Sequence, residues 1–417
     1  ACGGQDESSG ESDGKQVDLE FLNASVDQDR VDLIDSLIAK FEEENPGIKV
    51  KQVPVEEDSY NTKIVTLANS NQLPEIIEGG FYMHKSLNQD QLIDLESVNR
   101  IIQEIGEDNY FKGPLELLKT DTGDGYLAVP ISGWVQGIWY NKQIFEENGI
   151  QEPATWDEIL DAAEKLTDLE NKQYGIALPT VEGQFSEQSF SQFALSNNAN
   201  VFDGEGNLTL NTPEMKEALE YYKELYKYTM PGSNDTTEVK DAFMNQSAAM
   251  AIYSTYILPS VYEEGWADDI GFIVPENKSK AVYGSVSALT VTSGLDDAHR
   301  EAAEKFILFL MQPDNMTEWV LMAPGGSQPV MPDVLEDPDY QANEVVNAFG
   351  DLFEVVASSF DNLQALGLVD GKNIPEMGDV TNSLAIPQMV NRATVGEEDV
   401  DQVIADVDDY VRNLLKR

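Results

Sequence analysis

Residues 126–142 read YLAVPISGWVQGIWYNK, and this stretch decides the fold class. Val129 and Pro130 close an apolar run, and because proline cannot donate to a β-ladder, we expect the strand to stop there or to lie at a sheet edge. Residues 138–140, IWY, restart an extended pattern with core aromatic side chains. Between the two, residues 132–134, SGW, provide a flexible step that carries one large flat side chain.

A helix follows this second strand. Thr155 with Glu158 three residues later forms a capping box, which marks a helix start. Apolar residues then recur at helical spacing, namely Ile159, Leu160, Ala163 and Leu166. A strand, a turn and a capped helix in this order are typical of an α/β fold.

The length of 417 residues exceeds one ordinary core and fits two lobes with a tail. Residues 17–22 alternate as a first strand, residues 31–41 have a helical apolar stripe, and residues 48–53 resume a strand. This βαβ opening is common to many α/β proteins.

Four segments together carry a resemblance to a known family. Residues 126–142 with the following QIFEENGI, the FMNQSAAMAI run at 243–252, the GSVSALTVT run at 284–292 and the helical pattern near the C-terminus resemble the extracellular solute-binding proteins (family 1, maltose-binding-protein-like). These are the capture subunits of ATP-binding-cassette sugar importers. The resemblance covers nearly the whole chain beyond residue 17.

The resemblance implies an α/β, two-lobed periplasmic-binding-protein-like fold (type II) whose lobes are joined by a three-segment hinge. It places lobe 1 at residues 17–129 plus 287–325 and lobe 2 at residues 130–286 plus 326–417. Residues 1–16 are expected to be a disordered lipoprotein tether. The implied function is capture of a carbohydrate, an oligosaccharide, between the lobes and its delivery to the transmembrane permease subunits, with the protein acting as a monomer.

The charge balance restricts the partners. Against 76 acidic residues stand 26 basic ones, a formal charge of −50. Nucleic acid is excluded as a partner because a polyanion would be repelled. Free anionic substrates such as phosphate esters are disfavoured, although a local basic pocket would overrule the mean charge.

Cys2 is the single cysteine, so no disulfide forms within the chain. It precedes a polar run and resembles the lipidated cysteine that follows a bacterial lipoprotein signal, which implies a lipid anchor on the extracellular face of the cell membrane, or in the periplasm of a Gram-negative cell. The alternative is an accidental cysteine in a disordered tail.

A sugar offers apolar ring faces and a rim of hydroxyls, so its site needs flat aromatic surfaces and short polar side chains. The aromatic candidates, each of which could instead pack in the core, are Trp134, Tyr253, Tyr256, Trp266 and Tyr283. The candidates beside them in predicted loops and strand ends are Asn23, Ser25, Glu78, Phe81, Tyr82, Gln136 and Ser327. Glu78 could accept from sugar hydroxyls, or could be one more solvated acid.

The sequence offers little for catalysis. Two histidines, His84 and His299, and one cysteine make no soft metal site, and no phosphate-binding lysine loop or nucleophile elbow occurs. We therefore expect no cofactor, no metal and no enzymatic activity. Two alternatives stay open: a binding protein for a peptide, polyamine or glycerol phosphodiester, and a cell-surface carbohydrate-active enzyme or adhesin.

Overall fold

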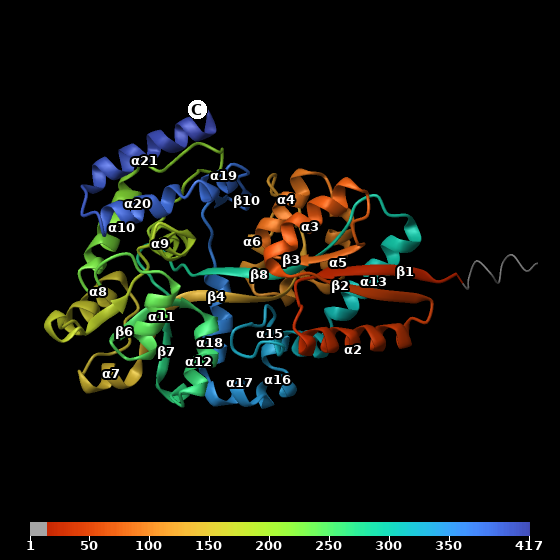
Figure 1. Ribbon diagram of the computed structural model, residues 1–417, viewed down its shortest axis with the longest axis horizontal. Helices are drawn as coiled ribbons and strands as arrows, with labels where there is room; N and C mark the ends of the chain where they lie inside the picture. Colours follow the sequence, from red (N-terminus) through yellow and green to blue (C-terminus); the bar gives the residue numbers. More distant parts are fainter. Residues whose placement is uncertain (1–14) are drawn as a thin grey trace, which may run out of the picture. The chain divides into compact units, whose positions relative to one another are not determined.

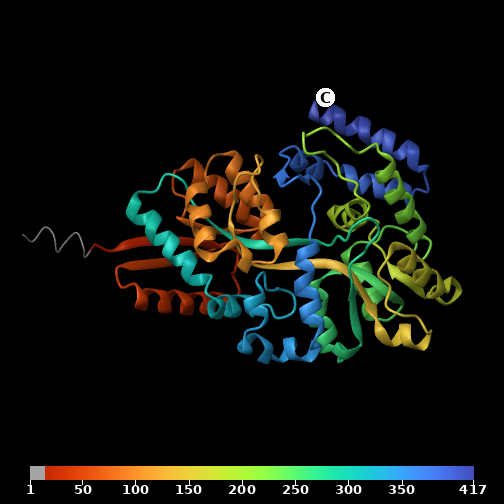
Figure 2. The same ribbon diagram turned by 180° about the vertical axis from the view of Figure 1, so that it is seen from behind.

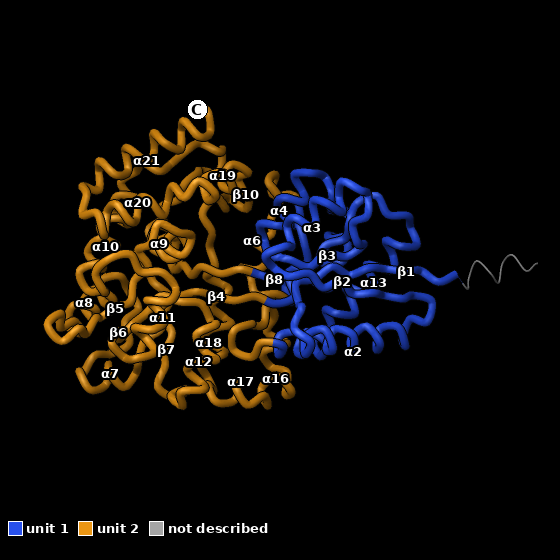
Figure 3. The backbone as a smooth tube through the Cα atoms, viewed as in Figure 1, with its two compact units in different colours: residues 1–109, 125–132, 286–322 blue, residues 110–124, 133–285, 323–417 orange. Residues whose placement is uncertain are grey.

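The computed structural model describes residues 15–417 (Figure 1), so Cys2 and all but the last two residues of the predicted tether lie outside the described residues. The chain divides into two compact units (Figure 3). Unit 1 contains Ala1–Asn109, Gly125–Ser132 and Val286–Met322, and unit 2 contains Tyr110–Asp124, Gly133–Ser285 and Ala323–Arg417.

The chain passes between the units five times, two more than the three-segment hinge expected from the sequence. The extra passages arise because residues 110–124, assigned from the sequence to the first lobe, pack into unit 2. The Phe111 N–H donates to the Val330 carbonyl at 3.0 Å, and the Asn373 amide donates to the carbonyls of Leu117 and Lys119 at 3.1 and 2.7 Å. These long-range hydrogen bonds have no signature in the local sequence.

The sheet of unit 1 has the strand order β2-β1-β3-β8. Strand β1 pairs in parallel with β2 and β3, and β8 runs antiparallel to β3. The strands are β1 (Val17–Asn23), β2 (Ile48–Pro54), β3 (Ile76–Gly79) and β8 (Tyr283–Val291), of which the first three residues of β8 belong to unit 2.

Helices cover both faces of this sheet. Figures 1 and 2 show α2 on one side of β1 and β2, and α3 and α4 on the other. The helices of unit 1 are α2 (Gln28–Glu44), α3 (Glu57–Asn69), α4 (Phe81–Gln89), α5 (Leu95–Ile105), α13 (Asp297–Leu310) and α14 (Pro313–Val320), with the 3-10 turn η1 (Glu107–Asn109). Helix α2 buries Ile34, Leu37, Ile38 and Phe41, which confirms the apolar stripe predicted there.

In unit 2, β4 pairs antiparallel with β6 and β7, and β5 runs parallel to β6. The strands are β4 (Val129–Asn141), β5 (Tyr174–Ala177), β6 (Ala248–Ser254) and β7 (Ile270–Ile273), with a small hairpin of β9 (Leu368–Val369) and β10 (Lys372–Asn373). Strand β4 begins in unit 1 and ends in unit 2.

The predicted stop of the strand at Pro130 is wrong, and the flexible step predicted at 132–134 lies within a continuous strand. One strand runs through both positions without a break. The fixed φ of proline is compatible with extended backbone, and its missing N–H costs nothing to the β6 and β7 ladders, whose pairing with β4 begins only at Gln136 and Ile138.

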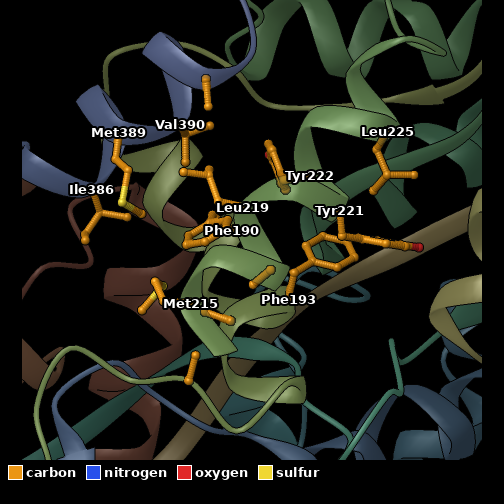
Figure 4. Close-up of a cluster of buried hydrophobic side chains, with 14 of the residues drawn as sticks. Phe190, Phe193, Met215, Leu219, Tyr221, Tyr222, Leu225, Ile386, Met389 and Val390 are labelled. Carbon is orange, nitrogen blue, oxygen red and sulfur yellow. The ribbon is translucent and has the colours of Figure 1, made fainter. Parts of the chain in front are cut away.

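The core of unit 2 lies between α9, α10, α20 and α21 and the sheet (Figure 4). Phe190, Phe193 and Tyr222 are fully buried there, and Ile386 and Val390 of α20 complete the cluster. The helices of unit 2 are α6 (Lys112–Leu117), α7 (Lys142–Glu147), α8 (Trp156–Lys165), α9 (Gln184–Ser196), α10 (Pro213–Tyr226), α11 (Thr236–Met244), α12 (Leu258–Glu263), α15 (Pro332–Leu335), α16 (Pro338–Ala342), α17 (Glu344–Phe349), α18 (Leu352–Ser358), α19 (Met377–Asn382), α20 (Ala385–Ala393) and α21 (Val400–Leu415), with 3-10 turns η2 (Leu169–Asn171), η3 (Thr255–Ile257), η4 (Ala267–Asp269) and η5 (Ser359–Asn362).

Two predicted local features are confirmed. Thr155 and Glu158 form the reciprocal capping box at the start of α8. Trp139 is fully buried and Tyr140 is 7% exposed, as expected for core residues. Across residues 15–417, the helices are all too short or too polar to cross a membrane.

Candidate functional site

Unit 1 brings several predicted site residues to one edge of its sheet. Strands β1 and β3 are parallel, so their carboxyl ends lie at the same edge, with Asn23 ending β1 and Glu78 near the end of β3. In open α/β sheets this edge is where ligands bind. The chain then enters α4, whose first two residues are Phe81 and Tyr82.

Asn23 shapes this edge and offers no surface to a solute. Its side chain is fully buried, its Oδ1 accepts the Ser25 N–H at 3.0 Å, and its Nδ2 donates to Gln52 Oε1 at 3.2 Å. Ser25 is itself 9% exposed. The amide of Asn23 therefore holds the turn after β1, and Ser25 is the residue of the two nearer the solvent.

Glu78 is half-buried, and its hydrogen bonds join β3 to the middle of β8 and to the residue after β1. Its Oε1 accepts from the Ser287 hydroxyl of β8 at 2.6 Å, and its Oε2 accepts from the Ala24 N–H after β1 at 3.3 Å. Burial, opposed by these two hydrogen bonds, raises the pKa of the Glu78 carboxyl above its usual range. Ser287 was not among the candidates predicted from the sequence, although its strand was.

Of the two aromatic residues at the start of α4, only Tyr82 presents a ring to solvent. Tyr82 is 48% exposed, whereas Phe81 is 8% exposed. Their ring centroids lie 5.2 Å apart, and Lys85 Nζ lies 5.3 Å from the centroid of Phe81. Phe81 thus supports Tyr82 from beneath.

Unit 2 brings together a second group of candidates. Trp134 of β4 and Tyr283 of β8 are both half-buried, with ring centroids 5.7 Å apart. The backbones beneath them approach closely, because a Cβ atom on Gly284 would lie 2.7 Å from the carbonyl oxygen of Trp134 and one on Gly133 would lie 2.6 Å from that of Ser285. Glycine at these two positions allows the aromatic pair to form.

The segment around Ser327 lies beside Tyr256. The Thr255 hydroxyl donates to the Gly326 carbonyl at 2.6 Å, and a Cβ on Gly326 would lie 2.4 Å from ring atoms of Tyr256. Tyr256 is 45% exposed, so one part of its ring is open to solvent. Ser327 is half-buried next to this ring.

Gln136 and Tyr253 connect these parts. Gln136 pairs across β4 and β6 with Ser254, is 1% exposed, and has an Nε2 atom without a hydrogen-bond partner within residues 15–417. Half-buried Tyr253 meets Phe185 of α9 edge-on at 6.0 Å. A buried donor without a partner is a group that a water molecule or a solute hydroxyl can satisfy.

Trp266 does not join this group. It packs against Phe243 with ring centroids 5.5 Å apart, and it precedes β7, whose first residue, Ile270, pairs with Asn141 at the far end of β4. Trp134 lies near the middle of that strand, seven residues before Asn141. Trp266 thus packs on a different ring from the Trp134 and Tyr283 pair, and its role in binding stays a prediction.

Two buried titratable residues escaped sequence reasoning. His84 of α4 is fully buried, and its Nε2 donates to the carbonyls of Gly79 and Ala288 at 3.0 and 2.8 Å; burial lowers its pKa to about 4. Glu187 of α9 is 7% exposed and accepts from the Thr381 hydroxyl at 3.0 Å, and burial raises its pKa to about 7. Neither residue carries a local sequence signal, because the pKa shifts of both side chains depend on tertiary burial.

The two groups contain the same kinds of side chain. Each supplies aromatic faces and neutral or acidic polar groups at strand ends. Within the described part of the chain, no group of three His, Cys, Asp or Glu side chains could hold a metal ion. The other histidine, His299, lies in the first turn of α13. Its backbone N–H donates to Oδ1 of the N-cap residue Asp296 at 2.8 Å.

Comparisons with known proteins agree with this arrangement. A family model described as bacterial extracellular solute-binding protein matches residues 36–348. A relative from Escherichia coli (strain K12), named "Putative ABC transporter periplasmic-binding protein YcjN", is 50% identical over 390 residues, which cover 94% of this chain and 91% of that protein. The "Multiple sugar-binding protein" of Streptococcus mutans is 24% identical over 405 residues, which cover 86% of this chain and 89% of the relative.

A solved structure shows the same fold. The cyclic alpha-maltosyl-1,6-maltose binding protein from Arthrobacter globiformis matches with a TM-score of 0.78 and 21% identity, over 96% of this chain and 99% of that one. The predicted α/β fold of the two-lobed periplasmic-binding-protein type is thereby confirmed.

Proposed function

This chain belongs to the family of bacterial extracellular solute-binding proteins, and from that membership we propose that it captures a neutral carbohydrate for an ATP-binding-cassette importer. The observation that carries the proposal is the presence, in each unit, of exposed or half-buried aromatic rings together with half-buried polar side chains. Tyr82 accompanies Glu78 in unit 1, and Trp134, Tyr283 and Tyr256 accompany Ser327 in unit 2.

This combination suits a sugar better than an apolar or anionic solute. Sugar C–H faces stack on aromatic rings, and hydroxyls bond to carboxylate, amide and hydroxyl groups. The name of one relative, the multiple sugar-binding protein, supports the same class, whereas other relatives that are 26% identical are named for binding sn-glycerol 3-phosphate. The chain's formal charge of −50 disfavours anionic solutes further.

For the mechanism, we take the two units as lobes joined by the strands and segments that pass between them. A solute that contacts both lobes favours the closed state, because closure adds contacts that the open state lacks. The closed protein, a monomer, docks on a membrane permease. A lipid on Cys2 would hold it at the extracellular face of the membrane, or in the periplasm.

A thermal-shift panel tests the proposal. Purified protein is heated with malto-, xylo-, manno- and fructo-oligosaccharides, with spermidine, with a mixed peptide pool and with sn-glycerol 3-phosphate. We expect one neutral sugar series to raise the melting temperature (Tm), because a ligand at a hundred times its Kd stabilises by about 2.7 kcal/mol, or about 5 °C or more for domains of this size.

A matched pair of variants localises the effect. Trp134→Ala should abolish most of the sugar-induced shift, whereas Trp266→Ala, which changes the same residue type away from the group, should retain it. A shift produced by spermidine, peptide or sn-glycerol 3-phosphate alone would overturn the carbohydrate assignment. Steady release of shorter sugars during incubation would instead identify an enzyme.

A further inference from the structure

Unit 2 contains a cavity that none of the candidate sugar-binding residues lines. Its volume is about 370 Å³, and every residue around it belongs to the segment 335–354. This segment contains α15, α16, α17 and the start of α18, which pack on one another (Figure 1). A volume of this size is within the range of small-molecule sites. We refer to it as the α15–α18 cavity.

The buried part of the cavity lining is aromatic. The rings of Tyr340 and Phe353 are buried and stacked, with centroids 6.4 Å apart. Phe349 stacks on Phe353 in turn, at 5.3 Å. Because the face of an aromatic ring carries partial negative charge, such a surface attracts cations.

The Tyr340 hydroxyl is a buried polar group without a partner. The side chain is 1% exposed, and its oxygen has no hydrogen-bond partner within residues 15–417. Burial raises the pKa of this hydroxyl, so it stays protonated and neutral. A buried polar group that lacks a partner is costly, and a solute in the cavity that Tyr340 lines can remove this cost. The hydroxyl oxygen can accept a hydrogen bond from a solute N–H group.

The exposed part of the cavity lining is acidic. Glu336, Asp351 and Glu354 line the cavity and are exposed, and within residues 15–417 none of them forms a salt bridge. No Lys, Arg or His is among the residues that line this cavity. The adjoining cavity of about 420 Å³ shares Asp351 but is also lined by Lys142, which makes it a poorer site for a cation.

This combination suits an organic ammonium ion better than a metal ion or an anion. Within the described residues, no three His, Cys, Asp or Glu side chains are grouped closely enough to hold a metal ion. An anion would be repelled by the carboxylates. An ammonium group can donate to a hydroxyl oxygen and to carboxylates and can lie over an aromatic ring.

We propose that the α15–α18 cavity is a second binding site, separate from the residues proposed to bind carbohydrate, and that it takes a small organic cation with a primary ammonium group. The Tyr340 hydroxyl accepts an ammonium N–H in the buried part of the cavity. Glu336, Asp351 and Glu354 balance the positive charge in the exposed part. This site goes beyond carbohydrate capture and does not depend on it.

Isothermal titration calorimetry in about 0.15 M NaCl tests the site, because salt at this concentration screens loose attraction between an amine and the acidic surface. The probe is putrescine, which has a primary ammonium group at each end. The control solutes are 1,4-butanediol, which has the same carbon chain without charge, and tetramethylammonium, which has the charge without N–H donors. We expect putrescine to bind saturably at one site, and each control solute to bind at least about tenfold more weakly.

Three variants locate the site. Tyr340→Phe removes only the hydroxyl that lacks a partner, so it should weaken putrescine binding about tenfold, while the Tm without putrescine stays equal or rises. Glu336→Gln combined with Glu354→Gln changes two exposed side chains and should weaken binding about tenfold or more in a fully folded protein. The matched control combines Glu217→Gln with Glu220→Gln on α10, also exposed, and should change the affinity less than about threefold.

The outcomes separate this site from carbohydrate capture. Trp134→Ala should leave putrescine binding intact, and Tyr340→Phe should leave the sugar-induced thermal shift intact. Absence of saturable putrescine binding, or full binding in Tyr340→Phe with loss in Trp134→Ala, would overturn the second site. Equal weakening by both pairs of glutamine substitutions would also overturn it, because putrescine would then bind the acidic surface without a specific site. Putrescine binding as predicted, in a protein that binds no sugar, would support the second site and refute carbohydrate capture.

Discussion

Replacing Glu187 with glutamine should stabilise the protein at alkaline pH and leave it nearly unchanged at acidic pH. The Glu187 side chain is 7% exposed on α9, its Oε2 accepts from the Thr381 hydroxyl, and its Oε1 has no hydrogen-bond partner within residues 15–417. Burial raises its pKa from 4.5 to about 7. The glutamine amide imitates the protonated acid and can accept the same hydrogen bond.

The sign follows from proton linkage. The folded protein holds the Glu187 proton more tightly than the unfolded chain, so this contribution to stability is fully present below about pH 4.5 and is lost as the pH rises through about 7. Each pKa unit corresponds to about 1.4 kcal/mol, so the loss at pH 8 is about 3 kcal/mol as an upper bound. For a domain of 150–250 residues, that is a Tm change of about 5–10 °C.

The assay is calorimetric unfolding of the wild type and Glu187→Gln at pH 5 and pH 8. We expect the variant to melt about 5 °C or more above the wild type at pH 8 and within about 2 °C of it at pH 5. Glu182→Gln, an exposed position just before α9, is the control and should show no such pH dependence. An equal difference at both pH values, or a less stable Glu187→Gln at pH 8, would refute the reasoning.

Three further substitutions test separate parts of the structure. Trp134→Ala should weaken sugar binding about tenfold or more in calorimetry while the Tm without sugar hardly moves, since the ring is half-buried; a collapse of stability would place it in the core. Gly284→Ala should lower the Tm by about 2–6 °C, because the alanine Cβ would lie 2.7 Å from the Trp134 carbonyl oxygen. An unchanged Tm would show that the backbone shifts to accommodate the methyl group. Gln246→Gly should raise the Tm by about 1–3 °C. Gln246 has a φ of 65°, a left-handed conformation that costs a non-glycine residue about 1 kcal/mol. A lower Tm in the variant would contradict this.

The local features of the fold were predictable because their causes are local. The capping box of Thr155 and Glu158 needs only four residues, and the stripe of α2 needs only helical spacing. Pro130 misled the same reasoning, because its effect depends on whether a neighbouring strand needs its N–H. The ladders that pair β4 with β6 and β7 do not extend to it.

The sequence predicted which types of residue the candidate site contains, but not which of those residues lie next to one another. Trp134 and Tyr283 were expected and lie beside each other, and Trp266 was expected and packs against Phe243, while the role of each in binding stays a prediction. Ser287 was missed because its role follows from the antiparallel register of β3 and β8, which places its hydroxyl on Glu78. Register and burial are tertiary properties, so sequence spacing alone could not supply them.

The most direct test of carbohydrate capture is a crystal structure of the protein with the sugar that gives the largest thermal shift. The account predicts one intact sugar whose ring lies on Trp134 or Tyr256 of unit 2. A sugar bound away from both residues, or found cleaved, would contradict it.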